Sequence, residues 1–363
     1  MTATQVGVIG GGQLGRMLLE AALALDIPLA FYVRPSDEGV RGWAATVVEG
    51  EFELAPLLAF AELVDVVTFE HELVPPPVLR ALEQRGVVLR PSARVMEVGS
   101  DKWLQRSLFA TLGLAGIPAQ LVDRGANELP RATPPYVLKA RHGGYDGRGV
   151  HWIQDVAELP PAGHWLAEPV LELDAEGAVL VARGLDGSLA VWEPVRLINR
   201  EGICVEASWP SGFAPRLRRA AHEAATAIAE QLEAVGVLAL EFFVIDGELV
   251  LNELAPRVHN SGHLTIEGAR TSQFENHLRA IAGLALGDTS ALGAAVMVNV
   301  LGGARTPWLP SDVRVHRYGK TPRPRRKVAH VTAVGPDLDD ARQRARRAAR
   351  LLGGELVEEV AEP

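Results

Sequence analysis

The chain has 363 residues, of which 48% are hydrophobic and 22% charged, and its formal net charge is −9. This length is too great for one hydrophobic core and predicts a globular protein of two or three domains. The acidic balance argues against a protein that coats nucleic acid, because such proteins are usually basic. The single cysteine, Cys204, excludes an internal disulfide and a multi-cysteine zinc site.

The hydropathy pattern does not predict a membrane segment. The most apolar stretch, residues 281–301, is interrupted by Asp288 and by several glycines. A strand is expected from Gln5 onward, which leaves no room for a signal peptide before it. We therefore expect a cytoplasmic protein with no membrane partner.

The first segment, residues 1–98, alternates short apolar runs with amphipathic stretches. This alternation predicts strands separated by helices, which is typical of a parallel, doubly wound α/β sheet. The predicted strands are residues 6–9, 28–33, 64–69 and 87–90, and the first predicted helix is 14–25. Ligands of such sheets bind at the carboxyl ends of the strands. The glycine turn at 10–12, the polar run at 68–72 and the segment 90–92 are therefore candidate sites.

The second segment, residues 99–296, mixes helices and strands in an α+β pattern, and the third, residues 297–363, is predicted to be a small β-rich domain. In the second segment we expect helices at 101–112 and 216–235 and strands at 136–139, 149–153, 165–169 and 178–183. A hairpin of 238–245 and 248–253 is expected across Asp246-Gly247. The third segment has a predicted strand at 329–334 and an arginine-rich helix at 339–352.

The run Gly10-Gly11-Gly12-Gln13-Leu14-Gly15 fits the dinucleotide fingerprint of glycines at positions one, three and six. A nicotinamide site also needs an acidic residue at the end of the second strand to bind a ribose hydroxyl. That strand ends in Tyr32-Val33-Arg34-Pro35, and no acid follows until Asp37. Three interpretations stay open: a nicotinamide-dependent oxidoreductase, a helix N-terminus that holds another ligand, and a tight turn without a ligand.

Only four of the 36 basic residues are lysines, and each lies in or beside a motif suited to an anion: Lys102, Lys139, Lys320 and Lys327. A chain that otherwise uses arginine is expected to keep lysine where a compact ammonium is needed and a planar guanidinium would not fit. The four lysines are thus predicted to contact ligands rather than to be solvated surface charges.

Lys139 ends an apolar strand and leads into a turn with four glycines in seven residues, from Gly143 to Gly149. Glycine lets backbone amides approach an anion closely, so this turn is predicted to contact a nucleotide phosphate. Its remaining side chains are Tyr145, Asp146 and Arg148. The alternative, a mobile hairpin tip, does not explain why an aromatic ring and two charges share it.

Glu241 and Glu253 lie on the two strands of the predicted hairpin, so both carboxylates can face one cleft. Unpaired carboxylates in an apolar setting are unfavourable, and a counter-ion is expected. Hard oxygen ligands, including the amide of Asn252, suit Mg²⁺ that is shared with substrate phosphates. The alternative is a pair of salt bridges to arginine.

Two further polar segments follow the hairpin. The loop 257–263 contains Arg257, His259 and His263 and has the donors to hold a small anion. Zinc ligation by the two histidines is disfavoured, because the segment lacks the glutamate of a helical zinc motif. The basic run 320–327 is broken by two prolines and is predicted to be a rigid phosphate clamp; a solvated loop or a nucleic-acid patch is the alternative.

The order of these motifs resembles the ATP-grasp superfamily. Within it, the chain is similar to the family of ATP-dependent subunits of phosphoribosylaminoimidazole carboxylase, the 5-(carboxyamino)imidazole ribonucleotide synthases. The residues that resemble the family are 11–17, 143–149, 252–263, 272–275 and 326–328, and the run from Asn252 is the most specific. The resemblance implies a pre-ATP-grasp domain at 1–98, an ATP-grasp domain at 99–296 with a mobile flap at about 113–170, and a C-terminal domain at 297–363.

The resemblance also implies a reaction of purine biosynthesis. ATP phosphorylates bicarbonate to carboxyphosphate, and the amine of 5-aminoimidazole ribonucleotide then takes up the carboxyl group, releasing ADP and phosphate. The implied cofactors are ATP and Mg²⁺, and the implied assembly is a homodimer. Phosphoryl transfer mostly needs positioning and charge neutralisation, which agrees with the lysines, amides and acids described above.

The resemblance implies residue roles by motif position. Those implied to bind ATP are Lys102, Lys139, Gly144, Tyr145, Asp146, Gly147, Arg148, Gly149, Glu168 near the adenine, Glu176 at the ribose, Asn252 and Glu253. Those implied to hold the ribonucleotide are Gln13, Leu14, Tyr145, Asp146, Arg148, Lys320, Arg326 and Lys327. Arg257 and His259, together with Asp146 and Arg148, are the implied catalytic residues, and Glu241 and Glu253 the Mg²⁺ ligands.

The chain departs from the family pattern at four positions. Asn199 stands where a histidine is usual, Arg106 where a lysine is usual, and Arg325 and Ala329 where glycines are usual. Three rival functions stay open: a related ATP-grasp ligase or formyltransferase acting on another purine-pathway ribonucleotide, a nicotinamide-dependent oxidoreductase, and a non-catalytic nucleotide sensor.

Overall fold

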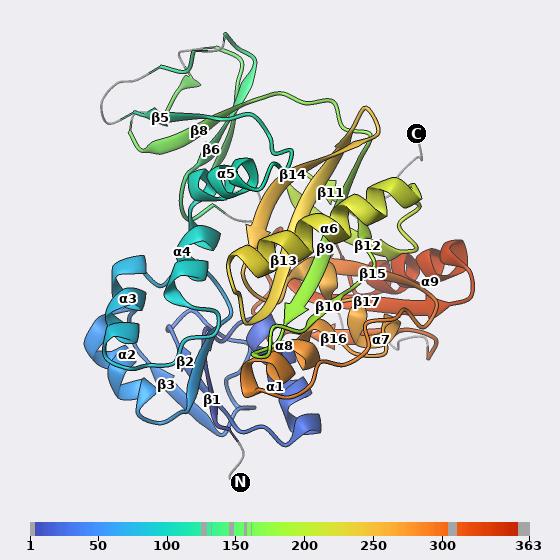
Figure 1. The fold of residues 1–363 in the computed structure, drawn as a ribbon. Coiled ribbons are helices and arrows are strands. Elements are labelled where there is room, and N and C mark those ends of the chain that lie inside the picture. The colour runs from blue at the N-terminus through green and yellow to red at the C-terminus, as the bar shows by residue number, and fades with distance from the viewer. Residues whose placement is uncertain are drawn as a thin grey trace.

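The computed structural model describes residues 4–354 except 125–128, 132, 145–148, 156–157, 161 and 304–310. The described strands form three sheets (Figure 1). A parallel sheet near the N-terminus lies at the bottom of the view, a small antiparallel sheet lies at the top, and a large sheet extends to the right. In the described part of the chain, each helix is too short or too polar to cross a membrane.

The first sheet has four parallel strands in the order β3-β2-β1-β4. Its elements are β1 (Val6–Ile9), α1 (Gln13–Leu25), β2 (Leu29–Val33), β3 (Thr46–Glu49), α2 (Leu54–Ala61), β4 (Val66–Phe69) and α3 (Pro76–Gln84). Alternate residues of the buried strands face opposite layers. Val8 and Phe31 pack with α1, whereas Ile9 and Tyr32 pack with α2 and α3. The predicted doubly wound sheet is therefore confirmed.

Two details of this sheet differ from the prediction. Residues 87–90 are not a strand; one parallel bridge joins Leu89 to Val67, and Pro91, which has no N–H, follows directly. The fourth strand is instead β3, which the sequence analysis missed. Its residues are only half-buried or exposed at the sheet edge, so they do not form the apolar run typical of a buried parallel strand.

The second sheet is antiparallel, with the order β5-β8-β6-β7. Its strands are β5 (Gln120–Asp123), β6 (Tyr136–Ala140), β7 (Val150–Ile153) and β8 (His164–Pro169). Two helices lead into it from the first sheet, α4 (Ala93–Ser100) and α5 (Lys102–Thr111). The predicted pairing of strands on either side of the glycine-rich turn is confirmed, with Lys139 opposite Val150.

The third sheet has nine strands in the order β14-β13-β9-β11-β12-β15-β17-β16, with β10 paired to β9. They are β9 (Ala175–Arg183), β10 (Leu189–Val191), β11 (Val195–Arg200), β12 (Ile203–Trp209), β13 (Gly236–Ile245), β14 (Glu248–Ala255), β15 (Ala294–Leu301), β16 (Arg314–Arg317) and β17 (Lys327–Gly335). The predicted β13–β14 hairpin is confirmed, including its turn at Asp246-Gly247.

Helices cover both faces of the β9–β13 region. They are α6 (Pro215–Gln231), α7 (Thr265–Gly268) and α8 (Gln273–Ala282), with a single 3-10 turn, η2 (Asn260–Gly262), before α7. On β9, Val179 packs toward α6, and Leu180 packs toward α8. The predicted helix 216–235 ends early, at Gln231, because Glu233 adopts a left-handed turn with φ of 49°.

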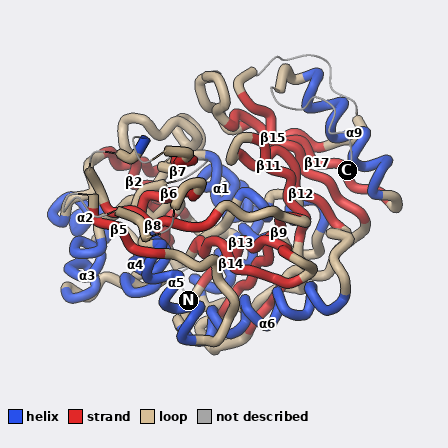
Figure 2. Tube along the Cα trace, turned by 90° about the horizontal axis from the view of Figure 1, so that it is seen from above, coloured by secondary structure: helices blue, strands red, loops and turns tan. Residues whose placement is uncertain are grey.

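The last helix, α9 (Leu338–Leu351), lies on β15 and β17, and Figure 2 shows these strands beside β11 and β12. The C-terminal strands therefore extend the large sheet rather than forming a sheet of their own. The proposed boundary between residues 296 and 297 falls inside β15. The three domain ranges themselves stay predictions.

His316 on β16 joins the N-terminal and C-terminal parts of the fold. Its Nε2 lies 2.7 Å from Oε1 of Glu267 on α7, and its Nδ1 lies 3.5 Å from Oε2 of Glu20 on α1. Although burial opposes protonation, hydrogen bonds to Glu20 and Glu267 raise the pKa of His316 to about 9. The neighbouring ring of His330, stacked at 4.6 Å, has a pKa lowered by burial.

The free energy of unfolding is expected to fall as pH rises from 7 to 10. A pKa raised from 6.5 to about 9 stabilises the folded state below pH 6.5, and this contribution is lost as pH rises through 9. Its upper limit is about 3 kcal/mol. Urea titrations at pH 6.5, 8 and 9.5 measure it. A His316→Gln variant should lose most of this slope; an equally steep variant would contradict the assignment.

Candidate active site

A cavity of about 1040 Å³ lies where the three sheets meet, and its wall takes residues from all three. All four lysines of the chain line it, although 225 residues separate the first, Lys102, from the last, Lys327 (327 − 102). A volume of this size lies at the upper end of the range for small-ligand sites.

The acidic wall comes from the β13–β14 hairpin. Glu241 and Glu253 are directly opposite each other in the antiparallel register, so their side chains lie on one face. Burial and the negative charges of Glu253 and Glu176 raise the pKa of Glu241 to about 7. Although burial opposes it, the ammonium of Lys102 lowers the pKa of Glu253. The two opposed carboxylates therefore differ: burial and like charge disfavour ionisation of Glu241, whereas Lys102 favours ionisation of Glu253.

Two lysines face these acids. Nζ of Lys102, on α5, lies 2.6 Å from Oε1 of Glu253. Nζ of Lys139, on β6, lies 2.7 Å from Oε2 of Glu168 and 3.0 Å from Oδ1 of Asn252. Burial lowers the pKa of Lys139, an effect that the charge of Glu168 opposes. Both ammonium groups are held at the cavity by carboxylates that a bound anion can replace or join.

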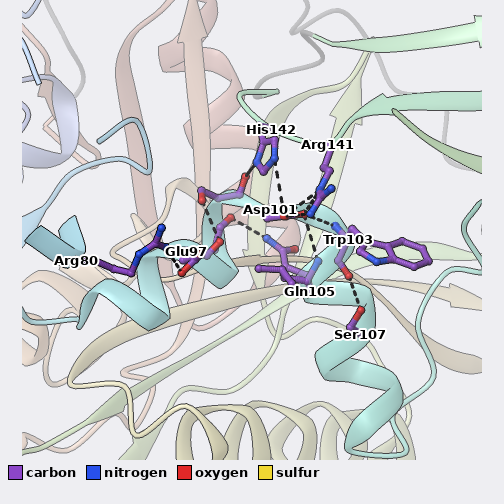
Figure 3. Close-up of polar contacts among 11 residues, drawn as sticks. Arg80, Glu97, Asp101, Trp103, Gln105, Ser107, Arg141 and His142 are labelled. Carbon is purple, nitrogen blue, oxygen red and sulfur yellow. Dashed lines mark hydrogen bonds and ion pairs between the residues drawn. The ribbon is translucent and has the colours of Figure 1, made fainter. Parts of the chain in front are cut away.

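The position of Lys102 follows from contacts at the start of α5, around Asp101 (Figure 3). Asp101 caps the helix by accepting from the amides of Trp103 and Leu104. The same carboxylate accepts hydrogen bonds from the guanidinium of Arg141 at 2.6–2.9 Å, just beyond β6. A charge-assisted pair of this kind has a fixed geometry. Asp101 therefore fixes Lys102 relative to the base of the glycine-rich hairpin.

Gln105 ties α5 to the strand that bears Glu253. Its Nε2 donates to the carbonyl of Leu254 at 3.1 Å, and its Oε1 accepts from the amide of Leu254 at 2.9 Å. The side chain is fully buried. This two-way contact sits one residue from Glu253 and one helical turn from Lys102, so it sets the distance between them.

The loop after β14 forms the next part of the wall. Nε of Arg257 lies 2.8 Å from Oε1 of Glu72, which follows β4 in the N-terminal sheet. Nε2 of His259 lies 3.6 Å from Oε1 of Glu241, and its Nδ1 lies 2.9 Å from Oγ of Ser261. Buried Gln273 fixes the loop through the amide and carbonyl of His259. Arg257 and His259 therefore reach the cavity beside the paired acids.

His263 does not share this position. Its ring is fully buried and stacks on His330 at 4.8 Å. Within the described ranges, no group of three or more His, Cys, Asp or Glu side chains is arranged to hold a metal ion.

A basic part of the wall belongs to the C-terminal loop and the glycine motif. Lys320 donates to Oε1 of Gln13, and Nη1 of Arg326 lies 3.0 Å from Oε2 of Glu38. Lys327 is largely buried at the start of β17. These groups meet at the carboxyl edge of the parallel sheet, where ligands of such sheets bind.

The glycine motif is already filled by a side chain. The carboxylate of Glu70 accepts hydrogen bonds from the backbone amides of Gly12 and Leu14 at the start of α1. A Cβ on Gly12 would lie 2.5 Å from this carboxylate, which explains the glycine. A dinucleotide pyrophosphate would need the same helix N-terminus. This contact argues against the nicotinamide interpretation.

The structure brings most predicted site residues to the cavity. Those that line it are Gln13, Leu14, Lys102, Lys139, Gly144, Gly149, Glu176, Glu241, Asn252, Glu253, Arg257, His259, Lys320, Arg326 and Lys327. Tyr145, Asp146, Gly147 and Arg148 lie outside the described residues. Glu168 is buried behind the wall, where it pairs with Lys139 and with Arg106 at 2.7 Å. Its predicted adenine contact stays a prediction.

Four further residues shape the site: Glu38, Glu70, Glu72 and Gln105. The sequence placed Glu70 and Glu72 in a candidate site, the polar run 68–72, without a role for either, and it did not assign Glu38 or Gln105 to the site. Glu70 and Glu72 had a signal, because they directly follow a buried strand of a parallel sheet. Glu38 and Gln105 had none, since their partners Arg326 and Leu254 lie 288 and 149 residues away.

The fold and the cavity define an ATP-grasp enzyme, and family comparisons agree. The ATP-grasp domain model matches residues 120–274, and the ribonucleotide synthetase preATP-grasp domain matches residues 3–100. The phosphoribosylaminoimidazole carboxylase C-terminal domain matches residues 295–344.

The chain belongs to the N5-carboxyaminoimidazole ribonucleotide synthase family. It is 40% identical to the synthase of Mycobacterium tuberculosis, over 96% of this chain and 88% of that protein. The structure of the Thermus thermophilus synthetase has a TM-score of 0.86 and 38% identity, covering 99% of this chain and all of that one. An Aspergillus clavatus synthase, solved with ADP and 5-aminoimidazole ribonucleotide, has a TM-score of 0.84 and 26% identity, covering 97% and 99% of the two chains.

Proposed function

We propose that this cavity carboxylates 5-aminoimidazole ribonucleotide with bicarbonate at the expense of ATP, through carboxyphosphate. Family membership supports the synthase activity. One observation supports the site: the two hairpin acids, the four lysines and the Arg257 loop are far apart in sequence and line one cavity. A phosphoryl-transfer enzyme needs this combination of anion-binding cations and metal-binding acids.

The ATP phosphates are proposed to lie between Lys102, Lys139 and the amides around Gly144 and Gly149. In the first step, an oxygen of bicarbonate attacks the γ-phosphorus, the bond between that phosphorus and the β–γ bridging oxygen breaks, and ADP leaves. Negative charge moves toward the bridging oxygen during this step. Fixed ammonium groups stabilise that charge without reorganising.

The residues present fit Mg²⁺. Glu241 and Glu253 face each other, and burial together with the charges of Glu253 and Glu176 raises the pKa of Glu241, so a bound cation would favour its ionised form. We propose these two carboxylates, with Asn252 beside them, as the protein's ligands. When bound, Mg²⁺ would neutralise phosphate charge and orient the phosphates.

The second step joins the carboxyl group to the ribonucleotide. The exocyclic amine attacks the carboxyl carbon of carboxyphosphate, the carbon–oxygen bond to phosphate breaks, and the amine loses a proton. Arg257 is proposed to neutralise the anionic carboxyphosphate and His259 to contact it. The ribonucleotide phosphate is assigned to the basic wall of Lys320, Arg326 and Lys327.

Phosphate release tests the function. It should require Mg²⁺, ATP, bicarbonate and 5-aminoimidazole ribonucleotide together. Release with formate in place of bicarbonate would support the formyltransferase alternative, and binding of ATP without turnover would support a nucleotide sensor. A change in NADH absorbance would support the oxidoreductase, against which the Glu70 contact argues.

We propose a homodimer in the cytoplasm, as expected for the family. Light scattering should then give twice the chain mass of 38.9 kDa. A mass of one chain across the micromolar range would contradict the dimer.

A further inference from the structure

Strand β11 brings Asn199 onto the face of the sheet that bears Glu176 of β9, next to the cavity. Leu197 lies directly opposite Glu176, and Asn199, two residues farther along β11, points to the same face as Leu197. On its other side β11 pairs with β12, where Val205 of β12 is the extra residue of a β-bulge opposite Ile198 and Asn199. The two cavity side chains form a hydrogen bond of 2.6 Å between Nδ2 of Asn199 and Oε2 of Glu176.

The chemistry of the two groups fixes the direction of this hydrogen bond. A carboxylate accepts only, so the amide nitrogen of Asn199 must be the donor. Both side chains line the cavity. In the described part of the chain, Asn199 is the one hydrogen-bond partner found for the Glu176 carboxylate, and it engages Oε2. Oε1 is left to accept from a ligand.

The environment of Glu176 makes that donor important. Burial raises the pKa of Glu176, which favours a protonated carboxyl group; the hydrogen bond from Asn199 and the charge of Lys139 oppose this. A protonated carboxyl group presents one oxygen as a donor. The ionised form presents acceptors to a ligand with hydroxyl donors, such as the vicinal diol of a ribose.

We propose that Asn199 is the positioning residue that holds Glu176 as the acceptor for the ribose hydroxyls of ATP, and so sets a preference for ribonucleoside over deoxyribonucleoside triphosphates. This inference rests on the proposed function, in which Glu176 meets the ribose. A hydrogen bond to a charged acceptor corresponds to about 10- to 100-fold in affinity.

The test compares the dissociation constants of ATP, 2′-deoxy-ATP and 3′-deoxy-ATP by calorimetry, without bicarbonate or ribonucleotide. The wild-type chain should bind ATP at least about 10-fold more tightly than one of the deoxy analogues. Asn199→Ala should reduce that ratio to about 3-fold or less, by weakening ATP binding. Asn199→His, which keeps an N–H donor, should restore it, and Asn199→Asp should weaken ATP binding further through like-charge repulsion.

Steady-state kinetics separate positioning from a general structural role. Asn199→Ala should raise KM for ATP while kcat stays within about 2-fold, since bound phosphates keep their contacts. In a Glu176→Gln background, the same substitution should have no further effect on the ratio. Glu97→Gln, an exposed carboxylate paired with Arg80, is the matched control and should change nothing.

An Asn199→Ala variant that keeps the wild-type ratio would overturn the inference, as would a wild-type chain that does not discriminate. If the alanine variant does not fold, Asn199→Ser replaces it, because its shorter side chain cannot span to Glu176. Binding with the expected ratio but without bicarbonate-dependent phosphate release would refute the proposed function and leave this inference standing. Bicarbonate-dependent phosphate release without a preference for ATP over the deoxy analogues would refute this inference and leave the proposed function standing.

Discussion

Replacing Glu253 with glutamine is expected to reduce phosphate release at least about 100-fold, a loss of about 3 kcal/mol of transition-state stabilisation. Glutamine keeps the shape of the side chain and removes its charge. The variant therefore loses a proposed Mg²⁺ ligand and the carboxylate that holds Lys102 at 2.6 Å. Phosphate release at saturating substrates, measured across a range of Mg²⁺ concentrations, quantifies the effect.

The matched control is Glu248→Gln, a carboxylate on the same strand that pairs with Arg216 at the exposed end of the hairpin. It should keep the wild-type rate. Both variants should unfold at similar urea concentrations, because Glu253 lies on the cavity wall and not in the core. A Glu253→Gln enzyme with near-normal turnover would remove the argument for a metal at this hairpin.

Lys139→Met should be the second most damaging substitution, with about 100-fold or more lost from kcat/KM for ATP. Methionine fills a similar volume without a charge, so the phosphates lose a nearby ammonium in a partly water-excluded site. Lys139→Arg should not rescue the rate, since the planar guanidinium cannot occupy the space between Glu168 and Asn252. Steady-state kinetics on both variants test this expectation.

A stability control separates the proposed contact of Lys139 with the ATP phosphates from its contribution to folding. Its removal leaves Glu168 buried with Arg106 as its remaining ion-pair partner, which should destabilise the fold. Adding Glu168→Gln to Lys139→Met should recover much of that stability while activity stays low. Recovery of activity together with stability would mean that Lys139 acts only through folding.

Local signals in the sequence were sufficient for most elements that bear the site. The β13–β14 hairpin followed from its Asp-Gly turn, and the strands around the glycine-rich hairpin followed from short apolar runs. The wrong strand predictions concern the edges of the N-terminal sheet. Residues 87–90 have an apolar pattern but form a single bridge, and β3 was missed because half-buried edge residues carry a weak pattern. An apolar periodicity indicates burial, and an edge strand has few buried residues.

No local pattern in the sequence predicts which distant residues pair with each other. Glu70 in the glycine motif, Glu38 on Arg326 and Gln105 on Leu254 each join segments more than 50 residues apart. The unusual use of lysine did identify groups that the fold gathers in one cavity, but it did not show which carboxylate each one meets. The predicted adenine residue, Glu168, illustrates this: it lies behind the wall, paired with Lys139 and Arg106.

The sequence by itself determined the family, the parallel N-terminal sheet and the identity of the charged groups, because turn residues, apolar periodicity and motif order are local properties of a chain. Only the tertiary structure decided which charges face one another, that a carboxylate fills the glycine motif, and that Asn199 donates to Glu176. Those facts depend on distances of a few ångströms between segments far apart in sequence, and such distances are set when the sheets pack together.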